Sequence, residues 1–181
     1  MRIQIDDKEF EPMIEYDQIK KRARLIGIQL NVSYEGLHPI FIGILNGSFM
    51  FMGDLMKEVE IPCEITFLKL ASYEGAQRKD NVEELIGLGK DISGRHVVIV
   101  EDIVDTGHTL CHILDAINKL QPASVAVCTL LLKPTEILYK FENIAYVGFE
   151  IGKEFVVGYG LDYKDMGRTL KDIYKEVDAN R

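Results

Sequence analysis

Three acidic residues and a short polar turn lie between an apolar run and an amphipathic segment in residues 97–120. The apolar run, Val97-Val98-Ile99-Val100, is rich in β-branched residues, which is typical of a buried parallel strand. Acids and turn residues follow it: Glu101, Asp102, Asp105, Thr106, Gly107, His108 and Thr109. Residues 110–120 then carry leucine and isoleucine at helical spacing. The stretch therefore predicts a strand, a polar turn and a helix in direct succession.

The turn has the composition of a phosphate cradle. A helix start presents unpaired backbone N–H groups and the positive end of the helix dipole. Gly107 lets the backbone approach a ligand closely, and Thr106 and Thr109 add hydroxyl donors. The adjacent acids Glu101 and Asp102 suit a different group, either the vicinal hydroxyls of a ribose or a hydrated magnesium ion. A phosphate, a diol and a metal together outline a phosphorylated ribose as the ligand.

An isolated Asp-Thr-Gly indicates a phosphate site only weakly, because Asp and Thr also cap helices well. The complete string from Val97 to Thr109 is far more specific. It resembles the phosphoribosyl-pyrophosphate (PRPP) signature of type I phosphoribosyltransferases, and later segments narrow the resemblance to the hypoxanthine-guanine phosphoribosyltransferases. The resemblance makes Asp105 the general base of the reaction. It implies that PRPP is bound by Glu101, Asp102, Asp105, Thr106, Gly107, His108 and Thr109.

A second strand and turn lie earlier in the chain. Residues 39–45 predict a buried strand, and Ser48 is a candidate cap for the helix that follows. By spacing alone this is an ordinary strand–helix turn. In the resembled family, however, the Leu-X-Gly turn binds pyrophosphate through backbone N–H groups and commonly holds a cis peptide. The pyrophosphate contacts that the resemblance implies are Asn46, Gly47, Lys69, Ser72, Tyr73 and Arg168.

A long polar stretch, residues 72–94, follows another strand candidate at residues 63–71. Such a long connection inside a compact domain is usually functional or disordered. Residues 82–88 within it predict a short strand. The resemblance makes this stretch a lid that closes over PRPP and excludes water. The alternative is that Tyr73 is merely a surface aromatic.

The base-binding residues implied by the resemblance lie in two later segments. Lys133 ends an apolar run at residues 124–132, where a lone lysine is usually just solvated. Residues 146–163 read on their own as a hairpin with core aromatics. The implied purine contacts are Lys133, Phe155, Val156 and Asp162, with Lys133 donating to the exocyclic oxygen and Phe155 stacking on the base. The implied ligands of Mg²⁺, the expected cofactor, are Glu101, Asp102 and Asp162.

The length of 181 residues suits a single domain. The resemblance implies an α/β fold of the type I phosphoribosyltransferases, with a mainly parallel central sheet flanked by helices at about residues 38–145. A small hood over the purine site is expected from the N-terminal segment and residues 146–170. Residues 1–13 predict an edge strand with a turn at Pro12, and residues 171–181 a terminal helix or frayed tail.

Composition restricts the partners. The net charge of −8, without a cluster of Lys and Arg, argues against nucleic acid. The apolar runs are far shorter than the roughly 20 residues of a membrane span, and the N-terminus has no signal-peptide core. Three cysteines without a Cys-X-X-Cys pair fit reduced thiols in the cytoplasm, although one nucleophilic cysteine is an alternative.

The expected activity is transfer of the 5-phosphoribosyl group from PRPP to hypoxanthine, and to guanine, in purine salvage. The products are the nucleoside monophosphates IMP and GMP, with pyrophosphate. Two alternatives stay open: a purine- or PRPP-responsive regulator that binds nucleic acid, and an enzyme that prefers xanthine. The resembled family also implies a homo-oligomer, a dimer or a tetramer.

Overall fold

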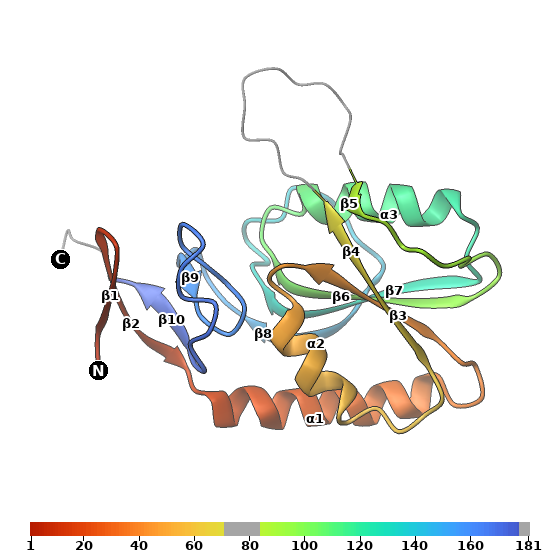
Figure 1. Ribbon diagram of the computed structural model, residues 1–181, viewed down its shortest axis with the longest axis horizontal. Coiled ribbons are helices and arrows are strands. Elements are labelled where there is room, and N and C mark those ends of the chain that lie inside the picture. The colour runs from red at the N-terminus through yellow and green to blue at the C-terminus, as the bar shows by residue number, and fades with distance from the viewer. Residues whose placement is uncertain (71–83, 178–181) are drawn as a thin grey trace, which may run out of the picture.

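The computed structural model describes residues 1–70 and 84–177, which form two β-sheets and the helices that cover the larger one (Figure 1). The larger sheet has the strand order β5-β4-β3-β6-β7-β8. Its strands are β3 (Ile40–Leu45), β4 (Glu64–Leu70), β5 (Glu84–Ile86), β6 (His96–Val104), β7 (Ser124–Leu132) and β8 (Ile144–Glu150). All neighbours pair in parallel except β4 and β5. Parallel pairing requires crossover connections, which place helices on the faces of the sheet.

The helices divide between the two faces of this sheet. They are α1 (Tyr16–Ser33), α2 (Phe49–Met56) and α3 (His108–Lys119). Buried residues of α1 and α2 pack with Phe41, Val98 and Val100, whereas those of α3 pack with Val97 and Ile99. Successive strand residues point to opposite faces, so the continuous apolar runs serve both cores. The predicted buried strands and the α3 periodicity are confirmed.

The smaller sheet joins the two ends of the described chain (Figure 1). Its order is β1-β2-β10-β9, and every neighbouring pair is antiparallel. The strands are β1 (Ile3–Ile5), β2 (Lys8–Ile14), β9 (Val156–Val157) and β10 (Ile173–Glu176). Its apolar side buries Ile5, Phe10 and Val157 in a separate small cluster.

Two local expectations about the chain ends are wrong. Pro12 does not turn the chain but lies within β2, opposite Tyr174 at a register irregularity. Because β1 pairs only with Lys8–Phe10, Pro12 lies beyond it, and the missing N–H costs no bond on that side. Residues 173–176 are strand β10 rather than a helix, because their backbone pairs with β2 and β9 and Ile173 is fully buried.

The hood boundaries also differ from those expected. Residues 144–150 form β8, the edge strand of the larger sheet, while β10 lies beyond residue 170. The α1 helix, which precedes residue 38, packs into the main core. Within the described ranges, no helix is both long and apolar enough to cross a membrane.

Candidate active site

Residues 105–109, named here the phosphate turn after the role expected from the sequence, connect β6 to α3 at the carboxyl end of the parallel strands. Gly107 caps the helix in the left-handed conformation, with φ of 86°. A Cβ at this position would lie 2.6 Å from the Phe141 ring, so both the backbone angle and the close packing require glycine. The side chains of Asp105, Thr106, His108 and Thr109 are exposed around a helix start that points its N–H groups outward.

Glu101 and Asp102 (the acid pair) lie just before this turn. Glu101 is only 5% exposed, and burial together with the Asp102 charge raises its pKa well above the usual value. Burial also raises the pKa of Asp102 to about 6, although its Oδ1 accepts a hydrogen bond from the Ile103 N–H at 2.9 Å. A buried acid beside a partly buried one costs stability in the absence of a ligand. They suit a ligand that supplies hydroxyl donors or a cation.

An Asp102→Asn variant is expected to be more stable than the wild type at pH 7.5 but not at pH 4. The folded protein keeps the Asp102 proton up to about pH 6, whereas the unfolded chain loses it near the ordinary value of 3.8. Stability therefore falls as pH rises between these values, by up to about 3 kcal/mol. Urea unfolding in EDTA at both pH values measures the difference in the free energy of unfolding between the variant and the wild type. Asp115→Asn, on the exposed side of α3, is the control, and an equal gain at both pH values would contradict the assignment.

Residues 46–48, named here the pyrophosphate turn after the role expected from the sequence, lie at the carboxyl end of β3. The Leu45–Asn46 peptide bond is cis. Asn46 is exposed, and Lys69 pairs with Leu45 from the neighbouring strand, which brings it beside the turn. Ser48 occupies the N-cap position of α2, as expected, but its side chain makes no capping bond, because its buried hydroxyl donates to the Ile44 carbonyl at 2.6 Å.

Gly47 joins the pyrophosphate turn to the acid pair. A Cβ on Gly47 would lie 1.5 Å from Asp102 Oδ2. A Gly47→Ala variant must therefore displace Asp102 or the turn, and overpacking of this kind costs about 1–3 kcal/mol. We expect PRPP affinity to fall by about tenfold or more in calorimetric titration. Gly53→Ala, where a Cβ meets open space on α2, is the control and should bind normally; equal behaviour of the two variants would contradict the contact.

Lys133 and Asp105 form an ion pair at the ends of adjacent strands β7 and β6. Lys133 Nζ lies 2.8 Å from Asp105 Oδ2. The lysine side chain is 7% exposed and that of Asp105 is 49% exposed, so the ammonium is buried while the carboxylate reaches solvent. The backbone N–H of Lys133 donates to the Val104 carbonyl, which sets the spacing of the two side chains. One donor and one acceptor are thus presented side by side at the start of the phosphate turn.

The loop that follows β9 reaches back to the pyrophosphate turn. Gly160 approaches the Gly47 carbonyl so closely that a Cβ would lie 2.0 Å from its oxygen. Arg168 donates to the Gly160 carbonyl at 2.9 Å and pairs with Asp162 at 2.7 Å. Arg168 and Asp162 act in opposite directions on the pKa of Asp102, which places this loop within electrostatic reach of the acid pair.

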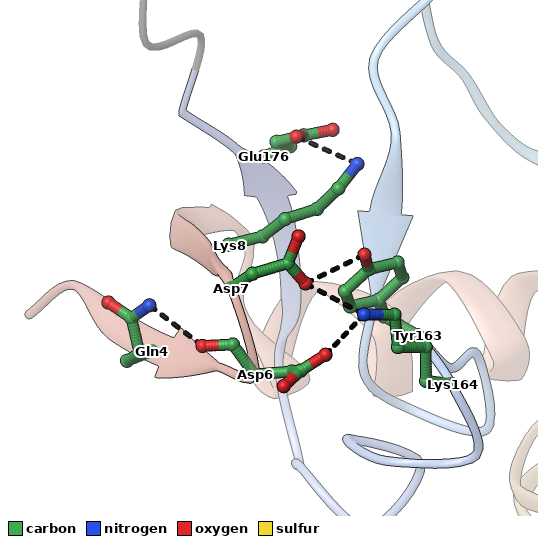
Figure 2. A network of polar contacts seen from close by, with 7 residues as sticks. All are labelled: Gln4, Asp6, Asp7, Lys8, Tyr163, Lys164 and Glu176. Carbon is green, nitrogen blue, oxygen red and sulfur yellow. Dashed lines mark hydrogen bonds and ion pairs between the residues drawn. The ribbon is translucent and has the colours of Figure 1, made fainter.

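The same loop is attached to the turn between β1 and β2, as Figure 2 shows. Lys164 pairs with both Asp6 and Asp7, and the Tyr163 hydroxyl donates to Asp7 at 2.9 Å. The N-terminal hairpin therefore supports the segment that carries Asp162 and Arg168.

Phe155 lies at the edge of the smaller sheet and is 40% exposed, whereas Val156 in β9 is buried. The Phe155 ring contacts Tyr163 edge-on and lies 4.9 Å from Lys8 Nζ. An exposed aromatic face held by aromatic neighbours can receive a flat ligand.

The comparisons with known proteins agree with one another. A family model described as the phosphoribosyl transferase domain matches residues 15–164. The hypoxanthine-guanine phosphoribosyltransferase of Streptococcus pneumoniae is 42% identical over 159 residues, which cover 87% of this chain and 88% of the relative. The hypoxanthine phosphoribosyltransferase of Salmonella typhimurium is 41% identical over 170 residues, covering 92% and 95% respectively. This chain belongs to the hypoxanthine phosphoribosyltransferase family.

The fold supports the same assignment. The structure of the Trypanosoma cruzi hypoxanthine phosphoribosyltransferase in complex with the product IMP superposes with a TM-score of 0.87 at 31% identity. The match covers 99% of this chain and all of the other. The type I phosphoribosyltransferase fold expected from the sequence is thereby confirmed.

In this member of the family, the tertiary structure brings most of the expected site residues to one edge of the larger sheet. The acid pair, the phosphate turn, Lys133 and the pyrophosphate turn lie at the carboxyl ends of β6, β7 and β3. Ser72 and Tyr73, and with them most of the expected lid, lie outside the described residues. Of residues 82–88, Glu84–Ile86 form strand β5. Among the described residues, no three His, Cys, Asp or Glu side chains gather as a ready metal site.

Three contacts of this phosphoribosyltransferase site were not expected from the sequence. Tyr139 and Phe141 pack against the phosphate turn, and Lys8 lies over Phe155. Tyr139 is 31 positions from His108 in the sequence, and Phe141 is 34 positions from Gly107. Lys8 is 147 positions from Phe155. The signal that points to the first pair is the placement of two aromatics between β7 and β8, in the loop that follows Lys133.

Proposed function

We propose that this chain transfers the 5-phosphoribosyl group from PRPP to hypoxanthine, and to guanine, as a purine-salvage enzyme. The observation that carries the proposal is the Lys133–Asp105 pair beside the phosphate turn. A purine presents N7 and its 6-substituent on one edge. An ammonium donates to the carbonyl oxygen of a 6-oxopurine, while the neighbouring carboxylate accepts a proton from N7. Adenine carries an amino group at that position and leaves the ammonium without an acceptor.

The reaction is a substitution at ribose C1′. The purine N9 forms the new bond to C1′ as the bond from C1′ to the pyrophosphate oxygen breaks, through a state with oxocarbenium character. Asp105 takes the proton that leaves N7, so the products are the nucleoside monophosphate, pyrophosphate and one proton. The backbone N–H groups of the phosphate turn hold the 5′-phosphate throughout.

The other residues divide by the part of the substrate that they contact. We assign the ribose hydroxyls to Glu101 and Asp102, and the base to Phe155 by stacking and Val156 through its backbone. Because pyrophosphate leaves as an anion, donors and cations must gather around it. We assign these to Asn46, Gly47, Lys69, Ser72, Tyr73 and Arg168.

Mg²⁺ fits the residues present. It is usually held by one or two carboxylates together with substrate phosphate oxygens, so a preformed three-ligand cluster is not required. We assign Asp162, Glu101 and Asp102 as its ligands. Asp162 pairs with Arg168 and accepts from the Asp165 N–H, yet a carboxylate has about four acceptor positions, so room for the ion remains. When bound, the ion neutralises charge on the leaving pyrophosphate.

Incubation of the purified protein with PRPP, Mg²⁺ and each of four purines tests the proposal. We expect nucleotide and pyrophosphate to form with hypoxanthine and guanine, and not with adenine. Preference for xanthine would instead support the alternative enzyme. Absence of product with every base, together with salt-dependent binding to nucleic acid, would support the regulator.

We further propose that the protein acts in the cytoplasm as a homo-oligomer, either a dimer or a tetramer. The family resemblance supports the homo-oligomer. The free thiols of the three cysteines support the cytoplasm. Light scattering coupled to size-exclusion chromatography measures the subunit number, and a monomer under assay conditions would contradict it.

A further inference from the structure

The segment between β7 and β8, residues 133–143, covers the phosphate turn. Three of its residues contact three different residues of that turn. The backbone N–H of Leu138 donates to the Thr106 carbonyl at 3.0 Å. The Tyr139 hydroxyl lies 2.6 Å from His108 Nδ1. The Phe141 ring fills the space beside Gly107 where a Cβ would stand.

Of these three contacts, the one between Tyr139 and His108 involves a side chain of the turn, at the start of the helix. His108 is the first residue of α3, directly after the left-handed Gly107. The rings meet edge-on with centroids 5.2 Å apart, and the Phe141 ring packs tilted against Tyr139 with centroids 5.9 Å apart. A short hydrogen bond combined with ring packing restricts the rotation of the imidazole.

The geometry of this turn determines how well it binds an anion, because on the proposed function several of its N–H groups contact the 5′-phosphate at once. A site of this kind binds well only when its donors are held close to their productive geometry by surrounding contacts. Two features oppose a fixed geometry here. The side chains on either side of Gly107 are exposed, and a glycine backbone can adopt many angles. The contacts from residues 138–141 are the restraint that opposes this freedom.

We propose that Tyr139 is a positioning residue for the 5′-phosphate: it holds His108 and the start of α3 in the geometry that binds the phosphate group. This inference rests on the proposed function, because it takes the turn as the 5′-phosphate site. It assigns no contact between Tyr139 and the substrate. Loss of the Tyr139 contact should therefore weaken binding only of ligands that carry a 5′-phosphate, since only those ligands depend on the turn.

A Tyr139→Phe variant removes the hydroxyl and keeps the ring. We expect the dissociation constants of IMP and PRPP, which both carry a 5′-phosphate, to rise by the same factor of about 3 to 10. The dissociation constant of pyrophosphate, measured with Mg²⁺, should stay within about twofold of the wild type. Leu138→Ala is the matched control, because its side chain is 67% exposed and its backbone bond to Thr106 is kept.

A His108→Asn variant tests the same bond from its other side and should weaken IMP binding to a similar extent. The double variant should be no weaker than the weaker single variant, because both changes break one contact. Unchanged IMP binding in Tyr139→Phe, or an equal loss for IMP and pyrophosphate, would overturn the inference. If the wild-type protein itself bound neither IMP nor PRPP, the proposed function would fail before these variants were compared.

Discussion

An Asp105→Asn variant is expected to lose about 10²- to 10⁴-fold in kcat, the usual contribution of a general base. Asparagine has nearly the same shape as aspartate but cannot accept the proton that leaves N7. Asp105 is half-exposed at the start of the phosphate turn and is held 2.8 Å from Lys133, so its carboxylate has a defined position. PRPP affinity should change little, because the backbone donors of the turn remain.

Single-turnover kinetics with hypoxanthine separates the chemical step from product release in this variant. Asp115→Asn, on the exposed side of α3, provides the matched control at the same change of charge. A kcat equal to that of the wild type would show that Asp105 does not take the proton.

The second large effect is expected at Lys133. In Lys133→Ala, kcat/KM for hypoxanthine and guanine should fall by about 10- to 100-fold, since hydrogen bonds from charged groups contribute about 1.5–3 kcal/mol. The lysine is 7% exposed, so solvent does not replace its ammonium readily. Its loss also leaves Asp105 without its partner. The dissociation constant of PRPP should remain within about threefold.

The activity of Lys133→Ala with adenine, compared with its activity with hypoxanthine, provides a further measurement. Without the ammonium, the ratio of kcat/KM for hypoxanthine to that for adenine should narrow. Lys140→Ala, whose side chain is 88% exposed in the same loop, is the matched control. An equal loss of PRPP and purine affinity in Lys133→Ala would contradict its role at the base.

The continuous stretch from β6 to α3 was predictable because its structure is local. A β-branched run, a glycine turn and a 3.6-residue periodicity each specify their own element, and the buried residues of α3 follow that periodicity. The parallel arrangement of β3, β6 and β7 then follows from buried apolar strands separated by helices. The candidate site residues at the strand ends came from the composition of the turn after β6 and from the resemblance to the phosphoribosyltransferases.

The chain ends were not predictable in the same way. Residues 173–176 are charged and polar apart from Ile173 and Tyr174, so their local pattern resembles a frayed tail. They become a strand because β2 and β9 supply backbone partners from positions far away in the sequence. Pro12 has a turn-forming propensity that is overridden by the pairing of residues on either side of it with β10. Sheet pairing of this kind depends on partners that no local window contains.

From the sequence alone came the fold class, the family resemblance and the list of candidate site residues. The tertiary structure alone decided how those residues touch: Lys133 against Asp105, Gly47 against Asp102, and Tyr139 against His108. Residue types and periodicity specify elements, because those depend on neighbours in the chain. Contacts between loops depend on backbone paths that are set only when the two sheets and the helices pack together.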